Sequence, residues 1–250
     1  MKKQLLILTT TALLTTACAK DNSIEVVYTP PPTQSTNIEI VSTPNLHNIE
    51  IEPIKIIDKP IIFKKERIDM TKEYIQKHYG FEVETIEMTP RIIVLHWTAI
   101  MTLDKSFKFL NPQKLRGRKD IVKASPLNVS AHFLIDRDGT IYRLMPDNWM
   151  ARHVIGLNYS SIGVENVGGE GNKKDDLTPA QLEANIKLVR YLKEKYPTIT
   201  HLIGHHEYRE LEGTELWLEL DKGYRTKKSD PGDRFMYAVR NEVADLNLTK

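Results

Sequence analysis

The chain of 250 residues has very little cysteine and no long hydrophobic run. Its single cysteine, Cys18, cannot form an internal disulfide bond, so the fold cannot depend on disulfide cross-links. The most apolar stretch, residues 4–14, is too short to cross a bilayer as a mature helix. The chain also lacks internal repeats.

An excess of either charge is missing as well. The formal net charge of +2 includes Lys2 and Lys3, and residues 1–17 contain no Asp or Glu, so the remainder carries (35 − 2) − 33 = 0. Without a basic excess, binding to nucleic acid has no electrostatic driving force, and we expect no nucleic-acid partner. The hydrophobic content of 40% and charged content of 27% are ordinary for a soluble globular protein that buries a full core.

The N-terminus contains a short export signal. Met1-Lys2-Lys3 and the apolar residues 4–14 resemble the n-region and h-region of a signal peptide. Residues 15–18 resemble a bacterial lipobox, although Thr15 stands where Leu is usual; the alternative is a secretory signal beside a stray thiol. We expect a signal peptide over residues 1–17 and lipidation of Cys18. The protein would then be a membrane-anchored lipoprotein of the bacterial cell envelope, in the outer membrane if the organism has one.

Proline dominates the next segment. The triplet Pro30-Pro31-Pro32 and the isolated Pro44 and Pro53 interrupt any regular structure, which predicts a semi-extended tether over residues 18–60. The folded catalytic domain is expected over residues 61–250.

Strand and helix patterns alternate through that domain, which predicts an α/β fold with a central mixed β-sheet flanked by helices. A Thr178-Pro179 start with Gln181 three residues after Thr178 is a capping box that opens a helix ending before Pro197. The other expected helices cover residues 71–79, 103–110 and 234–246, and the expected strands cover 92–95, 131–136, 140–144, 162–167 and 199–204.

Two histidines and an aspartate stand at strand ends or in a turn. His96 and His205 end apolar runs, where open α/β sheets place ligands, and Asp230 opens an Asp-Pro-Gly turn. Two imidazoles and one carboxylate leave a tetrahedral zinc one open position, as in catalytic sites. A lone histidine at a strand end is more often structural, and His206 competes with His205, so position alone does not choose between these two.

Five segments, taken in order, resemble the zinc-dependent N-acetylmuramoyl-L-alanine amidases, which share their fold with peptidoglycan-recognition proteins. The segments are residues 93–99, 129–144, 161–165, 202–205 and 228–232. The resemblance covers roughly residues 88–240. It implies one Zn²⁺ held by His96, His205 and Asp230, with His205 rather than His206 as the ligand. The domain would hydrolyse the amide between the lactyl group of N-acetylmuramic acid and L-alanine.

The same resemblance implies roles for five further residues. Glu165 would be the general base, and Lys228 would stabilise the oxyanion. His153, Trp97 and Asn128 would contact substrate, although the neighbours of His153 depart from the family pattern. Glu165 alone could equally be an edge-strand residue facing water.

The expected partners are peptidoglycan or muropeptides and, through Cys18, a membrane; the chain is expected to be a monomer. One alternative is a non-catalytic peptidoglycan-binding lipoprotein, and another is a structural envelope protein. The stretch 209–226, with Trp217 and Tyr224, is longer than the compact loop of the family. It would either form one wall of the cleft or pack over the core.

Overall fold

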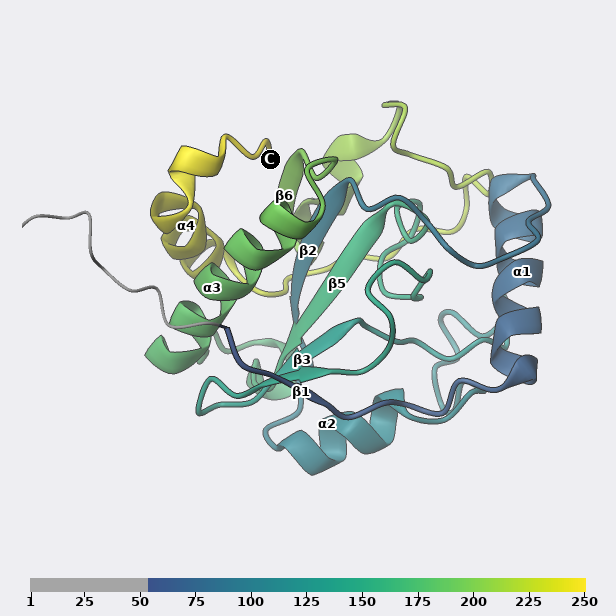
Figure 1. The fold of residues 1–250 in the computed structure, drawn as a ribbon. Coiled ribbons are helices and arrows are strands. Elements are labelled where there is room, and N and C mark those ends of the chain that lie inside the picture. Colours follow the sequence, from purple (N-terminus) through teal and green to yellow (C-terminus); the bar gives the residue numbers. More distant parts are fainter. Residues whose placement is uncertain (1–53) are drawn as a thin grey trace, which may run out of the picture. The chain divides into compact units, whose positions relative to one another are not determined.

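A six-stranded mixed sheet forms the centre of residues 54–250, the part of the chain that the computed structural model describes (Figure 1). The strand order is β1-β4-β3-β5-β2-β6. The neighbours β3, β5, β2 and β6 run parallel, and β4 is antiparallel to β3. The strands are β1 (Ile56–Asp58), β2 (Ile92–Trp97), β3 (Phe133–Ile135), β4 (Ile141–Arg143), β5 (Ser161–Asn166) and β6 (His201–Gly204). This confirms the predicted α/β class with a mixed sheet.

Within residues 54–250, four α-helices flank the sheet, together with short 3-10 segments. The helices are α1 (Lys65–Tyr79), α2 (Leu103–Leu110), α3 (Pro179–Lys195) and α4 (Asp233–Glu242). The 3-10 segments are η2 (Glu170–Asn172), η3 (His205–Leu211) and η4 (Ala244–Leu246). Among the described residues, no helix combines the length and apolar character that a membrane span requires.

The capping box that opens α3 is present in full. The side-chain oxygen of Thr178 accepts from the backbone N–H of Gln181 at 3.1 Å, and Gln181 Oε1 accepts from the backbone N–H of Thr178 at 3.0 Å. Pro179 occupies the first helical position, where its missing N–H costs nothing. Helix α1 ends at Gly80, which adopts the left-handed conformation that commonly caps helices.

Several element boundaries differ from the sequence prediction, and two starts differ by five residues or more. The folded part begins before residue 61, because β1 lies within the predicted tether and pairs in parallel with β4. An ion pair between Asp58 and Arg143, 2.8 Å from Oδ1 to Nε, supports this edge strand. Such pairing joins residues far apart in the sequence, and the short strand has no alternation long enough to reveal it. Helix α1 begins at Lys65, earlier than the predicted residue 71. The predicted signal peptide, Cys18 and most of the tether lie outside the described residues.

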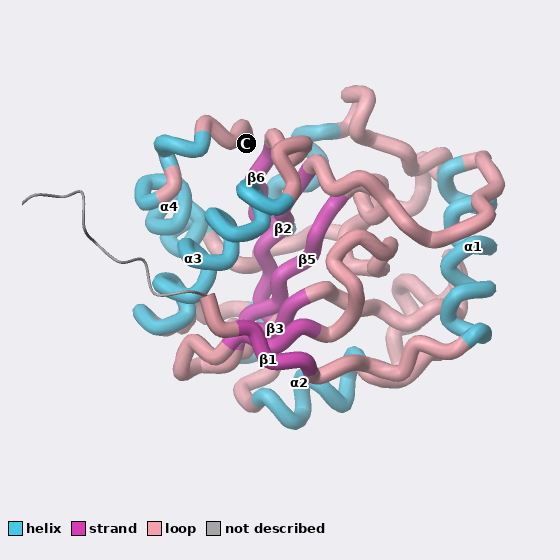
Figure 2. Tube along the Cα trace, viewed as in Figure 1, coloured by secondary structure: helices cyan, strands magenta, loops and turns pink. Residues whose placement is uncertain are grey.

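The two faces of the sheet are covered differently. Alternate residues of β2 point to opposite faces. Leu95 packs into a cluster with Leu188 of α3 and Val239 of α4, whereas Val94 packs with Tyr74 of α1 on the other face. Loops fill most of the region between the sheet and α1 (Figure 2). This loop-covered face is the one that bears His96.

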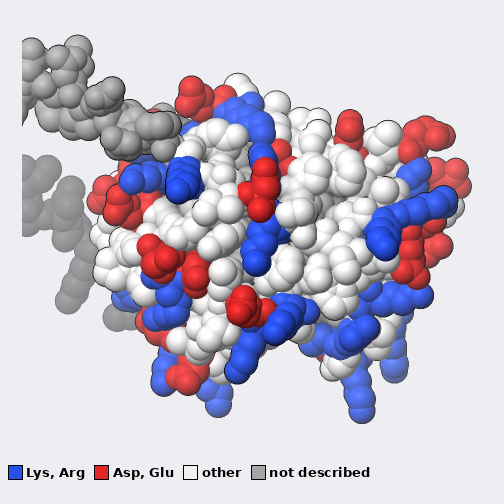
Figure 3. All heavy atoms as spheres, turned by 60° about the horizontal axis from the view of Figure 1, so that its bottom comes forward, with Lys and Arg blue, Asp and Glu red and all other residues white. Residues whose placement is uncertain are grey.

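On the face shown in Figure 3, lysine and arginine gather along the lower edge and mix with acidic side chains elsewhere.

Candidate metal centre and active site

Three elements bring the predicted metal ligands together. His96 is the penultimate residue of β2, and His205 directly follows β6. The two strands are parallel neighbours in the register Leu95↔Gly204, so their carboxyl ends meet. Asp230 lies in the turn that precedes α4 and is buried, as are both histidines. The fold therefore gathers side chains that are 25 and 134 residues apart in sequence.

The donor atoms of this set converge on one point. His96 Nδ1 lies 2.9 Å from His205 Nδ1, and Asp230 Oδ2 lies 3.2 Å and 3.0 Å from those two atoms. Donors at tetrahedral zinc bond lengths of ~2.0–2.1 Å are about 3.3 Å apart, so the spacing suits a small divalent ion. These three residues are also the group within residues 54–250 whose ligand atoms could hold a metal.

The protonation state of the set also fits a cation. Burial lowers the pKa of His205 to about 3, so its imidazole is neutral near pH 7. The pKa of Asp230 is held well below its usual range because the two histidines hydrogen-bond and attract the carboxylate, outweighing its burial. A neutral imidazole and an ionised carboxylate are the forms that bind a metal. The residues present therefore fit zinc.

The neighbouring histidine faces away from this set. The ring Nδ1 of His206 lies 2.9 Å from the backbone carbonyl oxygen of Asp230, and its backbone N–H donates to the same oxygen at 3.0 Å. His206 thus supports the turn that carries Asp230, while His205 turns its ring toward the Asp230 carboxylate. In the structure, His205 and not His206 therefore lies with the other two residues of the group.

Glu165 stands directly beside His96 on the adjacent strand. The register of β2 and β5 pairs His96 with Glu165, so both side chains point to the same face. The buried Oε2 of Glu165 has no hydrogen-bond partner. Burial raises the pKa of Glu165 to about 7, and the negative charge of Asp230 adds to this, while His96 and Lys228 oppose it. A carboxylate with a pKa near neutrality suits proton transfer.

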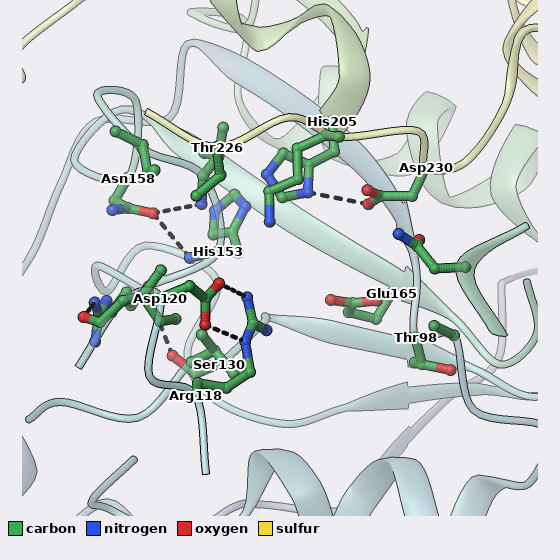
Figure 4. A pocket seen from close by; sticks show the side chains of 18 of the residues that line it. Thr98, Arg118, Asp120, Ser130, His153, Asn158, Glu165, His205, Thr226 and Asp230 are labelled. Carbon is green, nitrogen blue, oxygen red and sulfur yellow. Dashed lines mark hydrogen bonds and ion pairs between the residues drawn. The ribbon is translucent and has the colours of Figure 1, made fainter. Parts of the chain in front are cut away.

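A cavity of about 370 Å³ connects these groups (Figure 4). Glu165, His205, Asp230 and Lys228 all line it. Burial lowers the pKa of Lys228, whose charge also interacts with those of Asp230 and Glu165. The cavity is thus lined by two of the three predicted metal ligands, an unpaired carboxylate and a lysine; His96 lies behind them, outside the lining.

The three predicted substrate contacts have different locations. Trp97 lines the cavity and donates from Nε1 to Asn172 Oδ1 at 2.7 Å. His153 lines it too, but its ring Nδ1 lies 3.0 Å from His96 Nε2. Asn128 is not among the lining residues; its buried amide donates to the backbone carbonyls of Phe109 and Pro112, at 3.0 and 2.9 Å. Asn128 therefore holds a loop together and is not brought to the cavity.

The long stretch 209–226 both lines the cavity and packs over the core, the two roles that its sequence allowed. Tyr224 lines the cavity, and its hydroxyl accepts from Arg152 Nη2 at 2.9 Å. Trp217 instead packs beside Tyr208, with ring centroids 6.0 Å apart. The stretch is thus part of the cleft wall and part of the core.

Sequence reasoning missed an ion pair inside the cavity. Arg118 and Asp120 both line it and form a bidentate pair with contacts of 2.9 and 2.7 Å. They come from a loop without periodic pattern, so nothing local marks them. Gly163 is different, because a lone glycine inside a strand often marks the close approach of another group. Here that group is the ring of His153.

The fold and the site define an α/β protein in which two histidines and one carboxylate could hold a metal ion. The profile of the N-acetylmuramoyl-L-alanine amidase family, Amidase_2, matches residues 87–233, and the chain belongs to this family. The endolysin of Klebsiella phage KP32 is 40% identical over 84 residues, which are 32% of this chain and 55% of the endolysin. The endolysin of Escherichia phage T7 is 38% identical over 84 residues, with the same coverage. The chain thus spans about half the length of these curated relatives.

Solved structures of similar proteins include the endolysin amidase LysCS from Clostridium intestinale URNW. It has 24% identity and a TM-score of 0.47 over 79% of this chain and 99% of that one. Peptidoglycan recognition protein-LE, in complex with tracheal cytotoxin, has 15% identity and a TM-score of 0.45 over 74% and 92% of the two chains.

Proposed function

We propose that the protein is a zinc-dependent amidase that cleaves peptidoglycan between the lactyl group of N-acetylmuramic acid and L-alanine. The observation that carries this proposal is the convergence of His96, His205 and Asp230 beside the unpaired Oε2 of Glu165. Membership of the amidase family supports the choice of bond.

Zinc held by His96, His205 and Asp230 would act as a Lewis acid on the carbonyl of the scissile amide. Glu165 would accept a proton from the attacking water through Oε2 and later deliver it to the leaving amine of L-alanine. A base with a pKa near 7 can do both, because neither transfer is then strongly uphill. Lys228, on the same cavity, would stabilise the negative charge that develops on the carbonyl oxygen, and Trp97 would line the bound substrate.

Mass spectrometry of products tests this function. Full-length protein with zinc is incubated with muropeptides, and the Glu165→Gln variant serves as the control for contaminating hydrolases. An amidase releases free stem peptides and peptide-free glycans. Intact muropeptides that co-purify with the protein would instead identify a non-catalytic binder, and a protein that neither cleaves nor retains them would fit a structural envelope role.

The location in the cell is a second part of the proposal. We propose that Cys18 carries lipid and anchors the protein, as a monomer, to a membrane of the bacterial envelope, the outer membrane if there is one. The support is the signal-like segment 1–17 and the absence of any other cysteine. Metabolic labelling with a fatty-acid analogue should mark the wild-type protein and not Cys18→Ser. An unlabelled, freely secreted wild-type protein would contradict the anchor.

A further inference from the structure

The ring of His153 links a metal ligand to the backbone of strand β5. On one side, His153 Nδ1 lies 3.0 Å from His96 Nε2, the nitrogen that faces away from the metal-ligand set. On the other side, His153 Nε2 lies 3.2 Å from both the carbonyl oxygen and the Oγ of Ser161. Both nitrogens of a buried ring are therefore in use.

The neighbours of His153 fix where its proton lies. The hydroxyl of Ser161 donates to the carbonyl oxygen of Leu157 at 2.8 Å, so its hydrogen is not available to His153. The carbonyl oxygen of Ser161 can only accept. Both oxygens beside His153 Nε2 thus require a hydrogen on that nitrogen, and a neutral imidazole has only one. His153 Nδ1 must then accept, and the hydrogen that it accepts comes from His96 Nε2.

Two features of the fold hold the ring in this orientation. Gly163 has no side chain, and a Cβ at that position would lie 2.7 Å from Cγ and Nδ1 of His153. The Oδ1 of Asn158 accepts from the backbone N–H groups of His153 and Val154, both at 2.8 Å (Figure 4). Gly163 thus leaves space for the ring beside β5, and the two hydrogen bonds to Asn158 hold the backbone that carries it.

We infer that His153 is a positioning residue that keeps His96 in the tautomer with a free Nδ1 lone pair directed at the metal. A hydrogen bond to the second nitrogen of a ligating histidine fixes its tautomer and ring orientation. Here the acceptor is an imidazole with no carboxylate among its hydrogen-bond partners, so it adds no negative charge to the site. This inference deepens the proposed function and rests on its metal site, and it moves His153 from substrate contact to ligand support.

Zinc affinity of the full-length protein, measured by competition with a chelator, tests the inference. His153→Ala removes the acceptor and should weaken zinc binding by ~10–100-fold. His153→Gln can accept from His96 and donate to Ser161, so its affinity should stay close to wild type. His132→Gln is the control: that ring is also buried, donates to the Trp149 carbonyl and accepts from Gly163 N–H, but contacts no metal ligand. It should bind zinc as wild type does.

Equal losses in His153→Ala and His132→Gln would show a packing role and overturn the inference, as would wild-type affinity in His153→Ala. A second measurement needs neither a variant nor a metal. Nitrogen-15 NMR of the metal-free wild-type protein should show His96 protonated on Nε2; protonation on Nδ1 would overturn the inference. Because this readout is independent of zinc and of hydrolysis, failure of the proposed function stays distinguishable from failure of the His153 role.

Discussion

The two faces of strands β2 and β5 differ sharply: one packs against helices and the other meets the cavity. Leu95 and Val164 point into an apolar core under α3 and α4. His96 and Glu165, one residue further along each strand, share the opposite face, where Glu165 lines the cavity. Because alternate residues of a strand point to opposite faces, neighbouring residues here serve packing and the candidate site. The two faces should therefore respond independently to mutation.

The two faces also bury different polar groups: the α3 face buries amides that bond to each other, such as Asn185 and Asn166, whereas the cavity face buries histidines and a carboxylate. His132 and His153 have both ring nitrogens engaged, as buried polar groups usually do. Among residues 54–250, Glu165 is the carboxylate with a buried oxygen that has no partner. Leaving such a group unpaired costs stability, which is expected where a side chain is kept free for a reaction.

The largest expected effect is on turnover. Glu165→Gln removes the proton acceptor and should reduce the rate of muropeptide cleavage by ~10²–10⁴-fold. Zinc content should not change, because Glu165 is not a member of the ligand set. Glu170→Gln, an exposed acid on η2, is the control. Cleavage by Glu165→Gln within a few-fold of wild type would remove Glu165 from the mechanism.

On the core face, one residue before His96, a substitution should reduce stability and leave the site's chemistry intact. Leu95→Ala should lower the free energy of unfolding by about 2–5 kcal/mol, since Leu95 is fully buried among aliphatic side chains. The folded fraction should still bind zinc. Urea denaturation and zinc analysis of the same sample check this. Full stability with lost zinc would show that the two faces are coupled.

Glu165 should also make stability depend on pH. Its pKa is about 7 in the folded protein against the ordinary 4.5, so the folded state binds more protons between these values. The free energy of unfolding of the metal-free wild type should therefore fall as pH rises from 4.5 through 7. Glu165→Gln should be the more stable protein at pH 8, by up to roughly 3 kcal/mol, and should gain nothing at pH 4. Denaturation curves of both proteins at the two pH values test this, and a pH-independent difference would contradict it.

The smallest expected effect is a shift in the position of the pH–rate profile, caused by the charge of Lys228. Its positive charge lowers the pKa of Glu165, so Lys228→Met should raise that pKa. The acid limb of the pH–rate profile, where Glu165 becomes protonated, should then move to higher pH. Lys222→Met, at an exposed lysine that does not line the cavity, is the control. A limb that stays in place, or moves to lower pH, would show that the two charges do not interact across the cavity.

Much of the site could be predicted from local patterns. Apolar runs that end in His96 and His205 predict strand ends, and parallel strands place their carboxyl ends together. The Asp-Pro-Gly turn at Asp230 and the capping box at Thr178 are equally local signals. The resemblance to the amidases separated His205 from His206, which no pattern could do.

The remaining features depend on contacts between distant segments. The tautomer of His153 depends on the Ser161 hydroxyl, which itself depends on the Leu157 carbonyl. The amide of Asn128 is occupied by carbonyls that only the folded loop presents. No spacing in the sequence encodes these hydrogen bonds. The sequence therefore cannot distinguish a histidine that supports a metal ligand from one that contacts substrate.

Zinc content tests the central claim most directly. The full-length wild-type protein, His205→Ala and His206→Ala are purified in parallel and analysed by mass spectrometry for metals. Close to one zinc ion per chain is expected in the wild type and in His206→Ala, and essentially none in His205→Ala. Zinc retained by His205→Ala, or a wild-type protein that binds none, would contradict the metal centre described above.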